Sequence, residues 1–245
     1  MAKKPISKRI ERLAIVNRGD AAVRCLRTAK SLRECEGGGL ELIALYTPPD
    51  RDALFVRQAD RAVALPAENG AVAAYLDHDV LITALRSAGA DAVWPGWGFV
   101  AEDPVFVDRL DAEGIVFLGP SAAAMRSLGD KITSKLIAEK AGVPVTEWSG
   151  RALVDEADAL EHSERIGYPV VLKATAGGGG RGIRMVYEAG ELAEAFRSAK
   201  AEAAAAFGND SLFVEAMVRD GRHIEVQIAA DQHGHAISLG CRDCS

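Results

Sequence analysis

The chain has 245 residues, of which 49% are hydrophobic and 26% charged, a composition typical of a globular protein with one large domain or two small ones. Its formal net charge of -6 argues against broad nucleic-acid binding, although it still allows a local basic pocket for a phosphorylated ligand. No apolar run approaches the length of a membrane span, and the basic start of the chain lacks the apolar segment of a secretory signal.

The first half of the chain alternates short apolar runs with helical patterns. We predict strands at 13–16, 40–46, 62–65, 92–94 and 115–118, and helices at 19–34, 80–88 and 104–112. Strands that alternate with helices at this spacing predict a parallel sheet with helices on both faces, so the fold class is α/β.

Two turns in this half follow predicted strands. Residues 17–20 are explained by the start of a helix, with Asp20 in its first turn. Residues 94–99 place two glycines among aromatic side chains. They are equally consistent with a packed turn and with a binding loop at the carboxyl edge of the sheet.

The chain changes character after about residue 120. We predict helices at 121–128, 131–141, 155–166 and 191–207, and strands at 169–173, 183–187 and 211–215. Two last strands, 223–230 and 236–241, flank residues with turn chemistry and form a β-hairpin.

The most informative stretch is the glycine-rich loop at 177–182, which reads GGGGRG. A strand follows it where a dinucleotide-binding turn would need a helix, and no Gly-Lys-Ser/Thr follows as in a P-loop. Glycines let backbone N–H groups approach a phosphate closely, and Lys173 ends the strand before the loop. We therefore favour a lid over a nucleotide, mobile until the nucleotide binds, above a plain surface loop with a solvated lysine.

Two weaker signals have simpler explanations when taken alone. Lys131 follows Asp130, a plausible helix N-cap, so the pair is explained as a capping motif with a solvated lysine. One strand alternates polar residues, namely His223, Glu225 and Gln227, and the safer interpretation is that they form the solvent-exposed face of a sheet.

Four scattered cysteines without a secretory signal fit the reducing cytoplasm. Cys241 and Cys244 have the spacing of a metal-binding pair, but a zinc site needs a second pair, and the nearby candidates His233 and His235 match no known ligand pattern. We therefore expect core cysteines in a strand.

Taken together, eight segments resemble the biotin carboxylase component of acyl-CoA carboxylases, which has the ATP-grasp fold. They are IVNRG at 15–19, PGWGF at 95–99, GDK at 129–131, YPVVLK at 168–173, GGGGRG at 177–182, FVE at 213–215, HIEVQ at 223–227 and RDCS at 242–245. The resemblance implies a Rossmann-like N-terminal domain at 12–130. It also implies an ATP-grasp lid with its linking helix at 131–218 and the first hairpin of a C-terminal ATP-grasp domain at 219–245.

The same resemblance implies an ATP site. It assigns the ATP phosphates to Lys131 and Lys173, and the lid over them to Gly179 and Gly180. It assigns the hinge that holds adenine and ribose to Glu215, Ala216, Met217 and Val218, and a further nucleotide contact to His223. Lys131 and His223 thereby gain a function that their own patterns do not suggest. Many relatives have a Lys-Tyr pair in the hinge, so side-chain contacts to adenine differ here.

The implied reaction is ATP-dependent carboxylation of biotin through carboxyphosphate, the first half-reaction of an acyl-CoA carboxylase. The implied cofactors are ATP, Mg²⁺ or Mn²⁺, and biotin on a carrier domain, with bicarbonate as substrate. The implied partners are a biotin carboxyl carrier domain, a carboxyltransferase domain or subunit, and further copies of the chain.

In this family the catalytic and metal-binding residues follow later in the sequence. We therefore expect them beyond Ser245, and we expect the chain to be inactive alone. Two alternatives are another ATP-grasp ligase, such as a carbamoyl phosphate synthetase or a purine-synthesis carboxylase, and a non-catalytic nucleotide-binding or assembly module.

Overall fold

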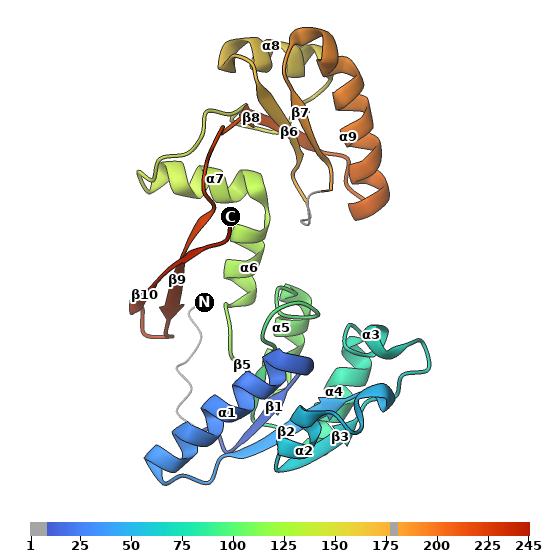
Figure 1. The fold of residues 1–245 in the computed structure, drawn as a ribbon, viewed down its shortest axis with the longest axis vertical. Helices are drawn as coiled ribbons and strands as arrows, with labels where there is room; N and C mark the ends of the chain where they lie inside the picture. Colours follow the sequence, from blue (N-terminus) through green and yellow to red (C-terminus); the bar gives the residue numbers. More distant parts are fainter. Residues whose placement is uncertain (1–8, 177–180) are drawn as a thin grey trace. The chain divides into compact units, whose positions relative to one another are not determined.

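The computed structural model describes residues 9–176 and 181–245 (Figure 1). The chain forms two compact units, a first unit that ends at Arg126 and a second unit that begins at Ser127. Each predicted helix and strand is present, with its ends within two residues of the predicted ones. The finer division at 130 and 218 stays a prediction.

A five-stranded parallel sheet forms the centre of the first unit, in the order β3-β2-β1-β4-β5. Its strands are β1 (Arg12–Ile15), β2 (Glu41–Tyr46), β3 (Arg61–Ala64), β4 (Ala92–Trp94) and β5 (Val116–Phe117). The order reverses on the two sides of β1, as in doubly wound α/β folds, and the predicted α/β class is confirmed.

Helices cover both faces of this sheet because its strands are apolar on both sides. Leu13 and Ile15 of β1 pack toward α1 (Gly19–Glu36) and α2 (Leu54–Gln58). Ala14 and Val16 pack toward the other layer, which consists of α3 (Ala71–Ala74), α4 (His78–Ala88) and α5 (Pro104–Ala112). The short elements α2, α3 and η1 (Pro48–Asp50) escape sequence prediction because fewer than two helical turns leave no periodicity.

The second unit contains a three-stranded antiparallel sheet in the order β7-β6-β8. Its strands are β6 (Val170–Ala174), β7 (Ile183–Val186) and β8 (Leu212–Ala216). Its helices are α6 (Ala122–Gly129), which crosses the limit between the units, α7 (Lys131–Lys140), α8 (Glu156–Ile166), η2 (Ala189–Glu191) and α9 (Leu192–Phe207). The side chains of α8 and α9 pack on one face of this sheet. In the described residues, no helix is long and apolar enough to cross a membrane.

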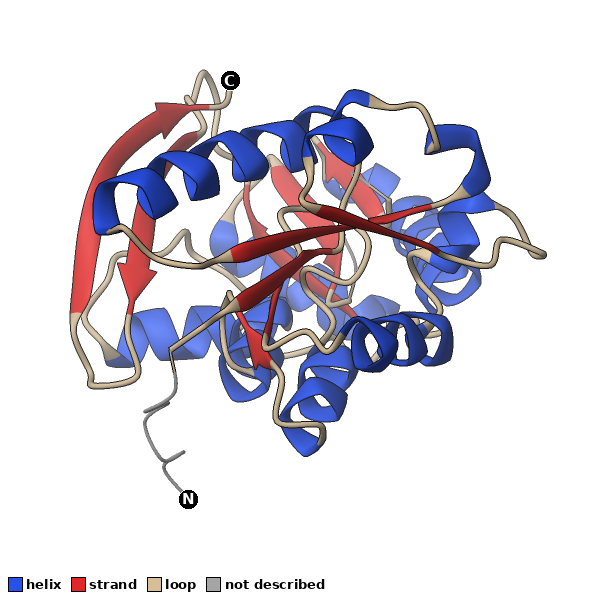
Figure 2. Cartoon of the chain, turned by 90° about the horizontal axis from the view of Figure 1, so that it is seen from below, coloured by secondary structure: helices blue, strands red, loops and turns tan. Residues whose placement is uncertain are grey.

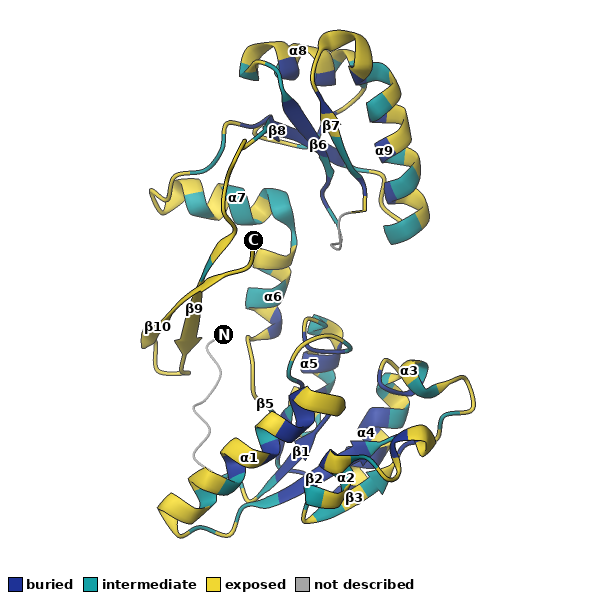
Figure 3. Ribbon diagram, viewed as in Figure 1, coloured by how far each residue is buried: buried dark blue, intermediate teal, exposed yellow. Residues whose placement is uncertain are grey.

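A separate hairpin ends the chain, formed by β9 (Ile224–Ala230) and β10 (Ala236–Asp243) (Figure 2). Figure 3 shows it as exposed, in contrast with the buried strand β6. Cys241 and Cys244 are exposed, so the expectation of core cysteines is wrong. The physical reason is that the hairpin is a two-stranded sheet without a second layer in the described part of the chain, so both of its faces meet solvent.

Candidate functional site

One face of the antiparallel sheet in the second unit carries charge. Leu172 and Ala174 of β6 pack into the core with α9, so Lys173 between them lies on the opposite face. On β8, Glu215 lies across from Val171 and therefore shares that face. The alternation of an antiparallel pair thus brings together a lysine and a carboxylate that are far apart in sequence.

Glu215 is a buried carboxylate with a lysine at each oxygen. The Nζ of Lys173 donates to Oε1, and the Nζ of Lys135, from α7, lies 2.7 Å from Oε2. The Thr146 hydroxyl also donates to Oε2, at 3.1 Å. Burial alone would raise the pKa of Glu215, but the hydrogen bonds and charges of Lys135 and Lys173 outweigh it and lower the pKa. Glu215 is therefore a stable anion shared by two cations.

Lys131 lies beside this group, at the start of α7. The Asp130 carboxylate caps the helix by accepting a 2.7 Å hydrogen bond from the Thr133 N–H. The Lys131 Nζ donates to the Ala174 carbonyl oxygen at 2.9 Å, at the end of β6. Burial, and then the charge of Lys173, lowers the pKa of Lys131. The ammonium groups of Lys131 and Lys173 therefore repel one another electrostatically.

The charges in this cluster do not balance. Two lysines, Lys135 and Lys173, contact the single buried carboxylate of Glu215, and Lys131 lies beside them, so lysine charge exceeds the buried carboxylate charge at the end of β6. A helix N-terminus beside lysine ammonium groups favours phosphate oxygens, because both donate to an anion. The site is therefore suited chemically to a phosphorylated ligand.

Trp148 packs against Lys135. Its indole Nε1–H donates to Glu139 Oε1 at 2.6 Å, and its ring centroid lies 5.6 Å from the Lys135 Nζ. Its ring also meets the edge of Phe213, with the centroids 6.0 Å apart. Sequence reasoning missed Lys135, although its i, i+4 spacing from Lys131 places both lysines on one face of α7.

The far end of the glycine loop is fixed to the sheet. The Ala174 N–H donates to the Gly182 carbonyl at 2.8 Å, and the Gly182 N–H donates to Glu202 Oε2 at 3.0 Å. Gly182 has a φ of 68°, and a Cβ there would lie 2.7 Å from the Ala174 Cβ, so only glycine fits. Gly179 and Gly180, and the mobility predicted for their loop, lie outside the described residues.

The remaining predicted residues do not join the lysine cluster. Ala216 and Met217 continue from β8, and their N–H groups donate to the carbonyls of Glu147 and Pro169. Val218 is exposed. The side chain of His223 is mostly exposed, 3.5 Å from Glu225, and its N–H donates to Ser245. Their assignment to the nucleotide stays a prediction.

In the first unit, residues 94–99 form a packed turn tied by a buried asparagine. Asn17 Nδ2 donates to the carbonyls of Pro95 at 2.6 Å and Trp97 at 2.9 Å. A Cβ on Gly96 would lie 2.7 Å from the Trp94 ring. These contacts are those of a packed turn, although the Trp97 side chain is exposed.

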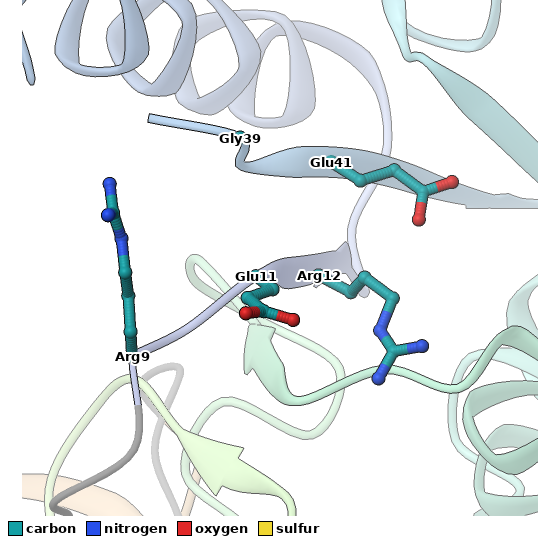
Figure 4. A pocket seen from close by; sticks show the side chains of 5 residues that line it. All are labelled: Arg9, Glu11, Arg12, Gly39 and Glu41. Atoms are coloured by element: carbon teal, nitrogen blue, oxygen red, sulfur yellow. The ribbon is translucent and has the colours of Figure 1, made fainter. Parts of the chain in front are cut away.

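A cavity of about 290 Å³ lies at the amino ends of β1 and β2, lined by Arg9, Glu11, Arg12, Gly39 and Glu41 (Figure 4). Its charges are of both signs, and two of them have partners within the fold: Arg12 pairs with Asp91, and Glu41 pairs with Arg61. The lysine cluster, with its surplus of one sign, is the stronger candidate. Within residues 9–176 and 181–245, no group of three or more His, Cys, Asp or Glu side chains could hold a metal ion.

Comparison with known proteins places these observations in a family. Residues 9–125 match the sequence profile of the biotin carboxylase N-terminal domain, and residues 130–245 match that of the carbamoyl-phosphate synthase L chain ATP-binding domain. Over 238 residues, 96% of its length, the chain is 40% identical to a biotin carboxylase of Pseudomonas aeruginosa. The chain belongs to the biotin carboxylase family.

Solved structures of the family have the same fold. The chain superposes with a TM-score of 0.90 on a Campylobacter jejuni biotin carboxylase solved as a beta-gamma-ATP complex, at 40% identity, covering 97% of this chain and 52% of that one. A biotin carboxylase domain of a Hydrogenobacter thermophilus 2-oxoglutarate carboxylase, solved with MgADP, ADP and bicarbonate, gives 0.88 at 36% identity, covering 97% and 51%. The predicted ATP-grasp architecture is confirmed.

The chain covers only the N-terminal part of its relatives. It spans 51% of the Pseudomonas enzyme and 33% of a propionyl-CoA carboxylase alpha chain of Ruegeria pomeroyi, to which it is 42% identical over 236 residues. The carbamoyl-phosphate synthase profile covers the second half alone, whereas these relatives match along 96% of the chain. The family is therefore that of biotin carboxylases and not of another ATP-grasp ligase.

Proposed function

We propose that this chain supplies the ATP-phosphate site of a biotin carboxylase, which uses ATP and bicarbonate to carboxylate biotin. The observation that carries the proposal is the surplus of lysine charge around Glu215, at the end of β6. Family membership supports it, as do relatives solved with ATP-type nucleotides and bicarbonate.

In this proposal the lysines serve a phosphoryl transfer that is chiefly positioning and charge neutralisation. A bicarbonate oxygen attacks the γ-phosphorus, the bond to ADP breaks, and carboxyphosphate forms. The C–O bond to phosphate in carboxyphosphate then breaks and gives CO₂ and phosphate. The released phosphate accepts the proton of a biotin ureido nitrogen, and that nitrogen forms a bond to the carbon of CO₂. Lys131 and Lys173 donate to the phosphate oxygens, while Lys173 keeps its hydrogen bond to Glu215.

Other parts of the ATP site are assigned by family resemblance. Residues 216–218 would hold the adenine and ribose, His223 would contact the nucleotide, and Gly179 and Gly180 would cover the phosphates. Mg²⁺ bound with the nucleotide would add to the neutralisation of phosphate charge, but the described residues contain no group of three or more His, Cys, Asp or Glu side chains that could hold it.

Relatives of this chain are named for different acceptors. They include the propionyl-CoA carboxylase alpha chain of Ruegeria pomeroyi and a subunit of the pyruvate carboxylase of Methanothermobacter thermautotrophicus, at 39% identity over 96% of this chain and 46% of that one. The region they share should serve the step they have in common, the carboxylation of biotin. We therefore propose a biotin carboxyl carrier and a carboxyltransferase as partners, further copies of the chain, an acyl-CoA acceptor and a cytoplasmic location.

The test is the ATP affinity of Lys173→Gln, measured by calorimetry on the longest polypeptide that the gene encodes. A charge-assisted phosphate contact is worth about 1.5–3 kcal/mol, so the dissociation constant should rise roughly tenfold or more. Lys140→Gln, at the exposed end of α7, is the matched control and should leave it unchanged. An unchanged constant in Lys173→Gln would refute the phosphate site.

A further inference from the structure

Two lysines share Glu215, but they occupy different environments. The Lys135 side chain is 15% exposed and the Lys173 side chain 30% exposed. Lys135 Nζ donates to Glu215 Oε2 and, at 2.8 Å, to the Thr146 hydroxyl, while the Trp148 ring lies on another side of it. Because an ammonium has three N–H donors, these contacts leave Lys135 little capacity to turn toward a ligand. It is the inner cation of the cluster.

Lys173 is the outer cation. Among the described residues its acceptor is Glu215 Oε1, so it can donate to that oxygen and still direct other N–H groups toward a phosphate. The attraction that Lys173 exerts on an anionic ligand depends on how far Glu215 neutralises its charge. If that carboxylate had Lys173 as its sole cation, the two would form a neutral pair and hold the ammonium inward.

We propose that Lys135 is a positioning residue for the ATP phosphates: it neutralises Glu215 from the inner side, so that the charge of Lys173 remains available to the ligand. This rests on the proposed ATP-binding function and assigns Lys135 no direct contact with ATP. The contact pattern supports it, since each lysine occupies its own carboxylate oxygen and Thr146 fixes the inner one.

The proposal makes a reciprocal prediction about charge. In Lys135→Met, Glu215 loses its inner cation and competes with ATP for Lys173, so ATP should bind roughly tenfold more weakly, the size of one charge-assisted hydrogen bond. In the double variant Lys135→Met/Glu215→Gln, the competing anion is gone as well, and most of the lost affinity should return. A purely structural role for Lys135 predicts the opposite, because two altered side chains would disturb the packing more than one.

The pH profile gives a second readout. Lys135 and Lys173 are the charged groups that lower the pKa of Glu215 against its burial, so this pKa should rise in Lys135→Met. As the pH falls toward about 4.3, the ordinary value for glutamate, the carboxyl of the variant should become neutral before that of the parent. The ratio of variant to parent dissociation constants should therefore shrink as the pH falls.

The experiment is calorimetric titration of ATP into the parent chain, Lys135→Met, the double variant and Lys173→Gln, between pH 4 and pH 8, on the longest polypeptide that the gene encodes. Lys135→Gln, which keeps an amide donor for Thr146, is the second variant in case methionine prevents folding. Lys140→Met is the surface control on the same helix. Weakening by Lys135→Met, recovery in the double variant and a ratio that falls with pH support the proposal.

Three outcomes would overturn it, and they separate it from the proposed function. Unchanged affinity in Lys135→Met, with weakening in Lys173→Gln, refutes the role of Lys135 and leaves the ATP site intact. A double variant as weak as Lys135→Met makes Lys135 either a direct ligand or a packing residue. Absence of ATP binding by the parent chain removes the proposed function and this inference with it.

Discussion

Each unit of the molecule contains a buried carboxylate, and the two are neutralised in different ways. Asp50 of the first unit accepts two hydrogen bonds from one guanidinium: Arg18 Nε to Oδ2 at 2.7 Å and Nη2 to Oδ1 at 2.6 Å. Glu215 of the second unit accepts one hydrogen bond at each oxygen from lysines on separate elements. The Asp50–Arg18 pair is neutral, whereas Glu215 with its two lysines has a net positive charge.

The choice of cation explains this difference. The planar fork of arginine matches both oxygens of a carboxylate and locks the geometry, which suits Arg18 as a clamp between the start of α1 and η1. Lysine offers a compact charge with three donors, so it can bond a carboxylate and a second anion together. A carboxylate that is hydrogen-bonded by several lysines therefore indicates an anion-binding site more strongly than a carboxylate paired with one arginine.

The largest expected contrast comes from removing each carboxylate's charge. Glu215→Gln leaves two lysines without their counter-ion in a buried site and should lower the free energy of unfolding of the second unit by about 3 kcal/mol. Asp50→Asn should cost the first unit about 1 kcal/mol or less, because the Arg18 side chain is 47% exposed and can turn to water.

Tryptophan fluorescence during urea denaturation separates the two units. Trp148 reports on the second unit when Trp94 and Trp97 are replaced by phenylalanine, and those two report on the first unit in Trp148→Phe. Equal losses in the two units would mean that Glu215 is no more dependent on its lysines than Asp50 is on its arginine.

Much of this comparison could be predicted from the sequence, because it depends on local periodicity. Strand alternation placed Lys173 before the glycine loop, and capping chemistry placed Asp130 and Lys131 at a helix start. The role of Lys135 could not be predicted in this way. Its partner Glu215 lies on β8, and pairing between distant elements leaves no pattern along the chain.

The environment of Glu215 could not be predicted either. Family resemblance assigns it to the nucleotide hinge, while its side chain lies between lysines and Thr146, 69 residues away in sequence. The cysteines are a second case in which contacts between distant elements decide the environment of a side chain. An apolar strand pattern predicted burial for Cys241, but burial depends on a second layer, which local periodicity does not reveal.

An intermediate effect is expected from an anion without a nucleoside. Sodium tripolyphosphate at ten times its dissociation constant should stabilise the second unit by about 1.4 kcal/mol, because binding to the folded state alone adds RT ln(1 + [L]/Kd). The first unit, whose buried carboxylate is matched by one arginine, should gain nothing. The same two fluorescence reporters measure both shifts, and Lys173→Gln should reduce the gain in the second unit. A similar gain in both units would indicate nonspecific anion binding.

The smallest expected effect tests whether the start of α7 belongs to the site or only to the fold. Asp130 caps α7, and Asp103 caps α5 in the first unit by accepting from the N–H groups of Val105 and Phe106. Removing either cap with alanine should cost its own unit about 1 kcal/mol. Asparagine caps a helix nearly as well, so Asp130→Asn should retain most of the stability.

The difference between these caps should appear in anion binding. Fraying of α7 displaces both Lys131 and Lys135, so Asp130→Ala should weaken tripolyphosphate binding, by calorimetry, a few-fold, within the roughly 1 kcal/mol that the cap contributes. Asp130→Asn should not weaken it, because the helix start is kept and a negative charge near Lys131 is removed. Asp103→Ala should lose comparable stability without any change in affinity. If Asp130→Ala also left the affinity unchanged, the lysines would be held by β6 and β8 alone, and the helix start would be a structural feature like its counterpart in the first unit.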